Sequence, residues 1–121
     1  MSKRVLVVED QEDNRQIMED MLTNAGYQVF KAKTGDEGVA LAEAQVPDLI
    51  LMDIMLPGID GYEATRRIKA QAALARIPII AVTSYAMQGE EDRAMAAGCD
   101  AYFGKPVSPR VLLAKIQDFI G

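Results

Sequence analysis

The chain contains no histidine and no tryptophan, and it has a single cysteine, Cys99, among its 121 residues. The absence of histidine excludes a Ser-His catalytic pair, a zinc site built on histidine and a phosphohistidine on this chain. A single cysteine excludes an intramolecular disulfide. A lone cysteine among small residues is most often a buried apolar side chain, so we expect Cys99 to be structural, with a reactive thiol as the alternative.

Long apolar runs and a basic surface are also missing. No run approaches the roughly 20 apolar residues of a membrane span. The N-terminal MSKR leads directly into the apolar Val5–Val8, without the h-region and cleavage site of a secretory signal. The 13 Lys and Arg are outnumbered by 18 Asp and Glu, whereas nucleic acids and anionic membranes attract clustered basic residues. We expect a cytoplasmic protein that binds neither nucleic acid nor membrane.

The apolar residues that are present alternate between strand-like runs and helical spacing. Strands are predicted at Val5–Val8, Gln28–Lys31, Asp48–Met52, Ile79–Val82 and Ala101–Phe103. A first helix is predicted because one helical face carries the apolar residues Ile17, Met18, Met21, Leu22 and Ala25, with Gly26 as its terminating residue. Further helices are predicted from the capping box at Thr34 to Ala44, from Tyr62 to Ala70, from Met87 to Ala97 before Gly98, and after Ser108-Pro109. This order predicts an α/β fold, a doubly wound five-stranded parallel sheet with helices on both faces. At this length we expect one domain, residues 1–121, without an output domain.

Polar side chains follow the strong strands, at the edge of such a sheet where ligands bind. They are the acids Glu9, Asp10 and Asp53, the hydroxyl residues Thr83 and Ser84, and Lys105. Each alone has an ordinary explanation, as an acid beginning a helix, a turn residue, the end of a strand or a solvated lysine. Coincidence explains poorly why every strong strand delivers such a residue to one edge.

Three carboxylates held close together raise one another's pKa unless a cation lies among them. Mg²⁺ suits Glu9, Asp10 and Asp53, and the backbone carbonyl of Met55 could complete its protein ligands. A hydroxyl and an ammonium group, from residues such as Thr83 and Lys105, would stabilise the oxygens of a phosphoryl group. A carboxylate beside such cations can act as a nucleophile and form an acyl phosphate.

Four segments carry a resemblance to a known family. "VLVVED", "PDLILMDIMLPGIDGYE", "PIIAVTS" and "AYFGKPVS" occur in that order between Lys3 and Ile120. In sequence and separation they resemble the signature blocks of the response-regulator receiver domain, also called CheY-like. The stretch from Thr83 to Ser108 further resembles the receivers of hybrid histidine kinases and of single-domain regulators.

The resemblance implies a role for each residue at this edge. Asp53 would be the phosphoacceptor, and Mg²⁺ would be held by Glu9, Asp10, Asp53 and the carbonyl of Met55. Thr83 and Lys105 would each contact a phosphoryl oxygen.

The resemblance also implies a switch. Tyr102 would change its rotamer as Thr83 moves, and the Lys105-Pro106 peptide bond would be cis. The face made by the fourth helix, the last strand and the fifth helix would bind a downstream protein target. Met55 and Tyr85 lack an acid or amide to orient an attacking water, so we predict a long-lived phosphate.

The implied function is that of a two-component phosphorelay response regulator. A histidine kinase or histidine phosphotransferase would donate the phosphoryl group to Asp53 in a Mg²⁺-dependent step. The chain would modify itself and would not be a turnover enzyme. A receiver domain cut from a hybrid histidine kinase and a scaffold that acts without phosphorylation remain as alternatives.

Two further classes fit less well. A haloacid-dehalogenase-like phosphatase would need a second acid two residues after Asp53, where this chain has Met55. A flavodoxin-like binding module would need a phosphate-cradling loop after the first strand. The loop at Glu9–Asp13 is acidic and would repel phosphate.

Overall fold

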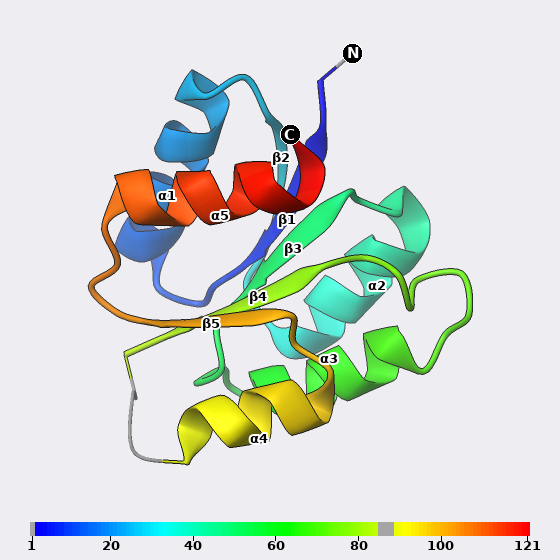
Figure 1. Ribbon diagram of the computed structural model, residues 1–121. Coiled ribbons are helices and arrows are strands. Elements are labelled where there is room, and N and C mark those ends of the chain that lie inside the picture. The colour runs from blue at the N-terminus through cyan, green and yellow to red at the C-terminus, as the bar shows by residue number, and fades with distance from the viewer. Residues whose placement is uncertain (1, 85–88) are drawn as a thin grey trace.

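The computed structural model describes residues 2–84 and 89–121, and these form the predicted α/β fold. The strands are β1 (Arg4–Val8), β2 (Gln28–Ala32), β3 (Leu49–Met52), β4 (Ile79–Thr83) and β5 (Ala101–Gly104). They make one parallel sheet in the order β2-β1-β3-β4-β5. The helices are α1 (Glu12–Asn24), α2 (Gly35–Gln45), α3 (Gly61–Lys69), α4 (Glu90–Ala97) and α5 (Pro109–Ile120). Helices α1 and α5 cover one face of the sheet, and α2, α3 and α4 cover the other (Figure 1).

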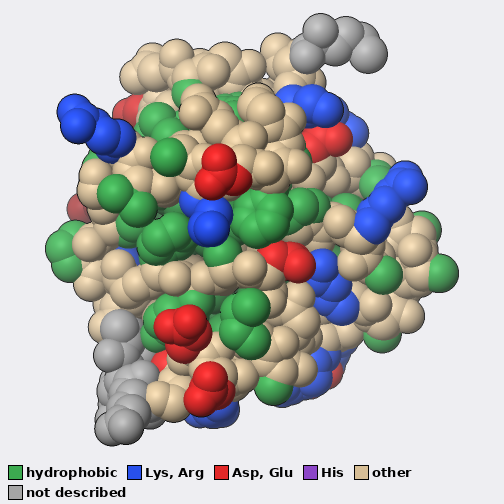
Figure 2. Space-filling model, in the orientation of Figure 1, with side chains coloured by type: hydrophobic (Ala, Val, Ile, Leu, Met, Phe, Trp, Pro, Cys, Tyr) green, Lys and Arg blue, Asp and Glu red, His purple; other side chains and the backbone are tan. Residues whose placement is uncertain are grey.

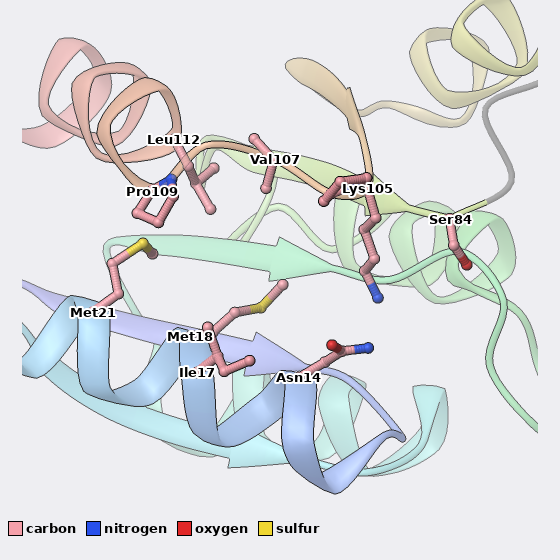
Figure 3. Close-up of a pocket in the computed structure, with 10 residues that line it drawn as sticks. Asn14, Ile17, Met18, Met21, Ser84, Lys105, Val107, Pro109 and Leu112 are labelled. Atoms are coloured by element: carbon pink, nitrogen blue, oxygen red, sulfur yellow. The ribbon is translucent and has the colours of Figure 1, made fainter.

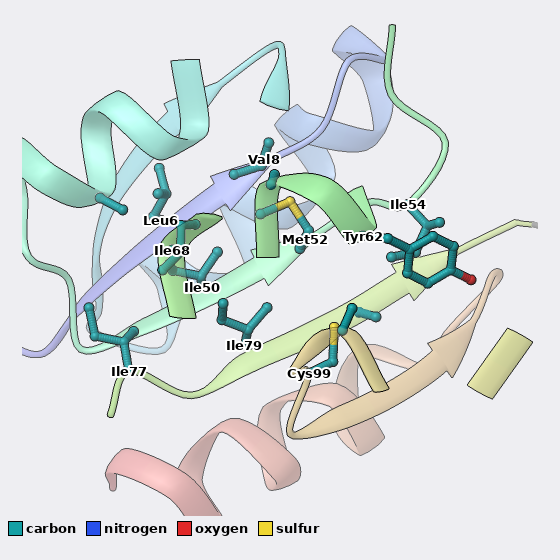
Figure 4. Close-up of a cluster of buried hydrophobic side chains, with 14 of the residues drawn as sticks. Leu6, Val8, Ile50, Met52, Ile54, Tyr62, Ile68, Ile77, Ile79 and Cys99 are labelled. Carbon is teal, nitrogen blue, oxygen red and sulfur yellow. The ribbon is translucent and has the colours of Figure 1, made fainter. Parts of the chain in front are cut away.

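The central strands are buried on both sides, which explains their continuous apolar runs. Successive side chains of a strand point to opposite faces, so Val5 and Val7 of β1 pack under α1 and α5. Leu6 and Val8 pack with the cluster beneath α2, α3 and α4 (Figure 4). Cys99 lies in this second cluster, 4% exposed, as expected for a structural cysteine.

The predicted helix signals are found with one exception. The side chain of Thr34 accepts a hydrogen bond from the Glu37 amide, which begins α2. Gly26 and Gly98 have left-handed backbones, with φ of 95° and 114°, just beyond the ends of α1 and α4. Ser108 occupies the N-cap position of α5, but in the described part of the chain its side chain makes no capping hydrogen bond.

One detail of the predicted helices differs from the structure, and another falls outside the described residues. Ile17 was expected on the buried face of α1 with Met18 and Leu22, which are indeed buried, but Ile17 is 60% exposed. A helical face is only a few side chains wide, and Ile17 lies at its edge. The predicted start of the fourth helix, Met87, lies outside the described residues, and the helix described begins at Glu90.

The parallel arrangement positions the polar residues. All five strands run in the same direction, so the residues that follow β1, β3, β4 and β5 meet at one edge of the sheet. The Lys105-Pro106 peptide bond after β5 is cis, as the resemblance implied. Within the described residues, every helix is too short or too polar to cross a membrane.

Candidate functional site

Three carboxylates converge at the carboxyl edge of the sheet. Glu9 and Asp10 follow β1, Asp53 follows β3, and ligand oxygens of the three lie within 4.8 Å of one another. Glu9 and Asp53 are buried, with 0% and 5% exposure, and Asp10 is partly exposed. Asp10 therefore faces the opening of a cluster whose other two acids are inside the protein.

The backbone around Asp53 is fixed on three sides. Its amide donates to the carbonyl of Val8 (3.0 Å), which joins the ends of β3 and β1. The Met55 amide donates to Asp53 Oδ1 (3.3 Å), so the chain turns around the carboxylate. Gly61 passes directly beside Asp53, and a Cβ atom at Gly61 would lie 2.2 Å from the Asp53 carbonyl oxygen. Only glycine fits this approach, and nothing in the sequence singles out Gly61 for this role.

Lys105 supplies the positive charge of the site. Its Nζ donates a hydrogen bond to Glu9 Oε1 and lies 3.6 Å from Asp53 Oδ2. Its amide donates to the carbonyl of Thr83 (2.7 Å), which ties the ends of β5 and β4 together. Thr83 is completely buried at the end of β4. The structure thus places Lys105 and Thr83 at the same edge as the acids.

The pKa values of the two buried carboxyl groups, Asp53 and Glu9, are shifted in opposite directions. Burial, with the neighbouring charge of Glu9, raises the pKa of Asp53 from 3.8 to about 7, although Lys105 and the Met55 amide oppose the shift. Burial would also raise the pKa of Glu9, but hydrogen bonds from Lys105, the Gln11 amide and Asp53 lower it overall. Without a metal ion, Asp53 is therefore the carboxylate whose negative charge is least well compensated by its surroundings.

The donor set fits a hard divalent cation. Carboxylate oxygens are the ligands that Mg²⁺ prefers, and it usually takes one or two carboxylates together with water. Glu9, Asp10 and Asp53 are the described residues that could hold it. The Met55 peptide adjoins Asp53 through its amide, and the Met55 side chain is 54% exposed, away from the core.

Two tyrosines pack in the hydrophobic cluster beneath α2, α3 and α4. The Tyr102 hydroxyl is buried and has no hydrogen-bond partner among residues 2–84 and 89–121. The Tyr62 hydroxyl donates to the Glu90 carboxylate, and the Arg93 guanidinium lies 4.6 Å from the Tyr62 ring centre. This link between α3 and the start of α4 could not be predicted, because a contact across 28 residues leaves no signal in a single sequence.

Two hollows border the site. One, of about 380 Å³, lies between α1 and the β5–α5 connection, where Ile17, Met18 and Met21 face Val107 and Pro109, and Lys105 lines its inner end (Figure 3). The other, of about 480 Å³, lies toward the start of α4. Its lining residues include Asp10, Met55, Tyr62, Glu90 and Arg93.

The described geometry agrees with a comparison against protein families, in which the model of the response regulator receiver domain matches residues 5–117. The chain belongs to this family. This receiver domain is 41% identical to the polar-differentiation response regulator DivK of Brucella ovis, over all of this chain and 98% of that protein. DivK of Brucella anthropi is similar to the same degree.

Solved receiver domains have the same fold. The receiver domain of a sensor histidine kinase from Pseudomonas aeruginosa aligns with a TM-score of 0.93 and 41% identity, covering 100% of this chain and 99% of that one. That structure has a magnesium ion coordinated in its active-site cleft. A CheY-like receiver from Methanospirillum hungatei aligns with a TM-score of 0.91 and 36% identity, over 98% of this chain and 93% of that one.

Proposed function

We propose that this receiver domain accepts a phosphoryl group on Asp53 from a phosphohistidine of a partner kinase or phosphotransferase. A carboxylate oxygen of Asp53 forms the bond to phosphorus while the phosphorus–nitrogen bond to the donor imidazole breaks. The electron pair of that bond returns to the imidazole nitrogen. The observation that carries the proposal is a buried Asp53 among two further carboxylates and Lys105.

The surrounding residues would have different roles in this reaction. Glu9, Asp10, Asp53 and the carbonyl of Met55 would hold Mg²⁺, which when bound offsets the negative charge of the carboxylates and the incoming phosphoryl oxygens. Lys105 would leave Glu9 to pair with a phosphoryl oxygen, since its Nζ already lies 3.6 Å from Asp53. The hydroxyl of Thr83 would bond another. The protein modifies itself in this step and performs no turnover.

The phosphoryl group would then act on a remote face. Movement of Thr83 would be transmitted to α4 and to Tyr102, whose buried hydroxyl could gain a partner as its ring moves. Hydrophobic side chains gather between α5 and α4, over β5 (Figure 2). Met95 and Val111 are about half exposed, which suits a face that binds a downstream protein target.

The donor protein would contact the hollow between α1 and the β5–α5 connection, called here the groove between α1 and α5. A donor must bring its phosphorus to Asp53, so its surface must cover the residues around the site. The groove between α1 and α5 opens at Lys105 and is mainly apolar, with Ile17 60% exposed at its rim. We infer that the helix carrying the donor histidine packs here, because apolar contact over this groove would hold the imidazole in line with Asp53.

The phosphate would be long-lived. The Met55 side chain is apolar and exposed beside the site, so it cannot orient a hydrolytic water. Tyr85, the other residue expected to affect hydrolysis, lies outside the described residues. A loss of phosphate as fast as in the quickest members of the family, without an added phosphatase, would contradict this inference.

Intact-mass measurement after incubation with phosphoramidate tests the main proposal. With Mg²⁺ the chain is expected to gain the mass of one phosphoryl group, and without Mg²⁺ or in Asp53→Asn it is expected to gain none. A folded chain that gains no phosphoryl group under any condition would favour a scaffold that acts without phosphorylation.

A further inference from the structure

Arg15, in the first half of α1, folds its side chain back over the loop that carries two of the acids. Its Nη1 donates hydrogen bonds to two successive backbone carbonyls, those of Glu9 (3.0 Å) and Asp10 (3.4 Å). These carbonyls belong to the short segment between the end of β1 and the start of α1. One guanidinium thus fixes the orientation of two consecutive peptide groups in the loop.

The three acids of the site are held in different ways. Glu9 is oriented through its own carboxylate, by Lys105 and by the Gln11 amide (3.1 Å). Asp53 is oriented in the same manner, by the Met55 amide and Lys105. Each of these two carboxylates is thus held by contacts of its own.

Asp10 differs, because its carboxylate accepts no hydrogen bond from any residue in the described ranges 2–84 and 89–121. The contacts that hold Asp10 in place therefore act on its backbone and not on its carboxylate. On one side that backbone is tied through the Glu9 amide to Ala32 of β2 (3.0 Å). On the other side Gln11, the N-cap residue, makes no side-chain capping bond within the described structure. Arg15 is the side chain that holds the intervening carbonyls.

We propose that Arg15 is a positioning residue for the Mg²⁺ site and sets the direction of the Asp10 carboxylate. The proposal rests on the proposed function, in which Glu9, Asp10 and Asp53 bind Mg²⁺. Residues behind metal ligands commonly influence metal affinity because they fix the ligand before the ion arrives. Here Arg15 contacts the backbone of the ligand residue Asp10 and not its carboxylate.

If charge were its only influence, Arg15 would have the opposite effect on Mg²⁺ affinity. A guanidinium near the cluster repels a divalent cation, so removing its charge would tighten Mg²⁺ binding if charge were its only influence. Positioning predicts weaker binding, because Asp10 must then be ordered when the ion binds. The sign of the change therefore separates the two effects.

The test is a calorimetric Mg²⁺ titration, at fixed ionic strength, of the unsubstituted chain, Arg15→Met, Arg15→Lys and Arg66→Met. Arg66 is an exposed arginine of α3 whose guanidinium, within the described part of the chain, bonds to Glu63 alone, so Arg66→Met controls for the loss of one positive charge. Arg15→Met is expected to weaken Mg²⁺ binding roughly 10-fold. Arg15→Lys, which keeps the charge and one donor group, is expected to recover part of the loss, and Arg66→Met is expected to bind as the unsubstituted chain does.

Thermal unfolding without Mg²⁺ accompanies each titration. If Arg15→Met does not fold, Arg15→Gln makes a smaller change and carries the same expectation. Equal or tighter Mg²⁺ binding by a folded Arg15 variant would overturn the positioning role while leaving the proposed function in place. Failure of the unsubstituted chain to bind Mg²⁺ would overturn both.

Discussion

At the scale of single residues, Asp53 is held at a cost to stability. Burial and the charge of Glu9 raise the pKa of Asp53 to about 7, although a carboxyl group in an unfolded chain titrates near 3.8. Between these pH values the folded state keeps a proton that the unfolded state releases. In the absence of metal, this group therefore makes the folded protein less stable as the pH rises from about 4 to about 7.

Asp53→Asn removes this titration without changing the shape of the side chain. In EDTA, the stability advantage of Asp53→Asn over the unsubstituted chain is expected to grow by about 2 kcal/mol between about pH 5.5 and pH 8. Urea unfolding at several pH values measures it. Stability curves of the two proteins that stay parallel over this range would show that Asp53 is ionised throughout.

The residues of the site were predictable to different degrees. Glu9, Asp10, Asp53, Thr83 and Lys105 could be found because each follows an apolar run, and parallel strands bring such positions to one edge. Contacts made by a long side chain to the backbone, such as those of Arg15, could not be found. A single sequence contains no pattern that predicts which backbone carbonyls an arginine side chain will contact.

At the scale of elements, the turn from β3 to α3 depends on Gly61. The backbone of Gly61 passes so close to Asp53 that a Cβ atom would meet the Asp53 carbonyl oxygen at 2.2 Å and the Ile54 Cα at 2.7 Å. Both are backbone atoms, so no side-chain rotation can relieve the collision. The sequence shows the turn through Pro57-Gly58, but it does not show which glycine is sterically required.

Gly61→Ala is therefore expected to cost about 3 kcal/mol or more of unfolding free energy. Gly58→Ala is the matched control, because Gly58 has nothing within 4 Å of its Cβ position and only a positive φ of 76°. The control is expected to lose about 1 kcal/mol. Equal losses in urea unfolding would mean that the approach of Gly61 to Asp53 is easily relaxed.

The groove between α1 and α5 depends on a side chain that was expected to be buried. The periodicity of α1 places Ile17 beside Met18, and only the packing of α5 decides which of them is covered. Met18 and Leu22 lie in the core with Leu112 and Ile116. Ile17 is left at the rim of the groove.

Ile17→Arg is expected to slow phosphoryl transfer from a phosphohistidine protein by about 10-fold or more while leaving the reaction with phosphoramidate unchanged. Val46→Arg is the control, since Val46 is exposed to 45% at the end of α2. Single-turnover transfer kinetics measure both. An equal effect on the protein donor and on phosphoramidate would place the defect in the site and not in the groove.

At the scale of the whole molecule, the two hydrophobic clusters cover the central strands from both faces of the sheet. The central strands β1, β3 and β4 are buried, whereas among the described residues α4 contacts the rest mainly through α3 and β5. The Tyr62–Glu90 bond links α3 to the beginning of α4. If the proposed switch operates, we expect a change at Thr83 to reach α4 and β5 before it reaches α2.

Beryllofluoride, a non-covalent analogue of the phosphoryl group, is expected to produce this pattern when added with Mg²⁺. The backbone amide signals of Tyr102, Phe103 and Met95 are expected to shift in a ¹⁵N–¹H correlation spectrum, whereas those of Ala42 and Val39 in α2 stay in place. Shifts of similar size in α2 and α4 would contradict a switch directed at one face.

The overall fold was the most predictable level, because alternating apolar runs and helical spacing determine an α/β sheet almost alone. The order of the strands and the burial of each helix face required the three-dimensional packing.

The central claim, that Asp53 accepts the phosphoryl group, is tested most directly by locating the acyl phosphate. Borohydride reduces an aspartyl phosphate to homoserine, which peptide sequencing by mass spectrometry can place in the chain. After reaction with phosphoramidate and Mg²⁺, homoserine is expected at position 53 and not at position 10. Modification at another acid, or none in a chain that binds Mg²⁺, would contradict the account.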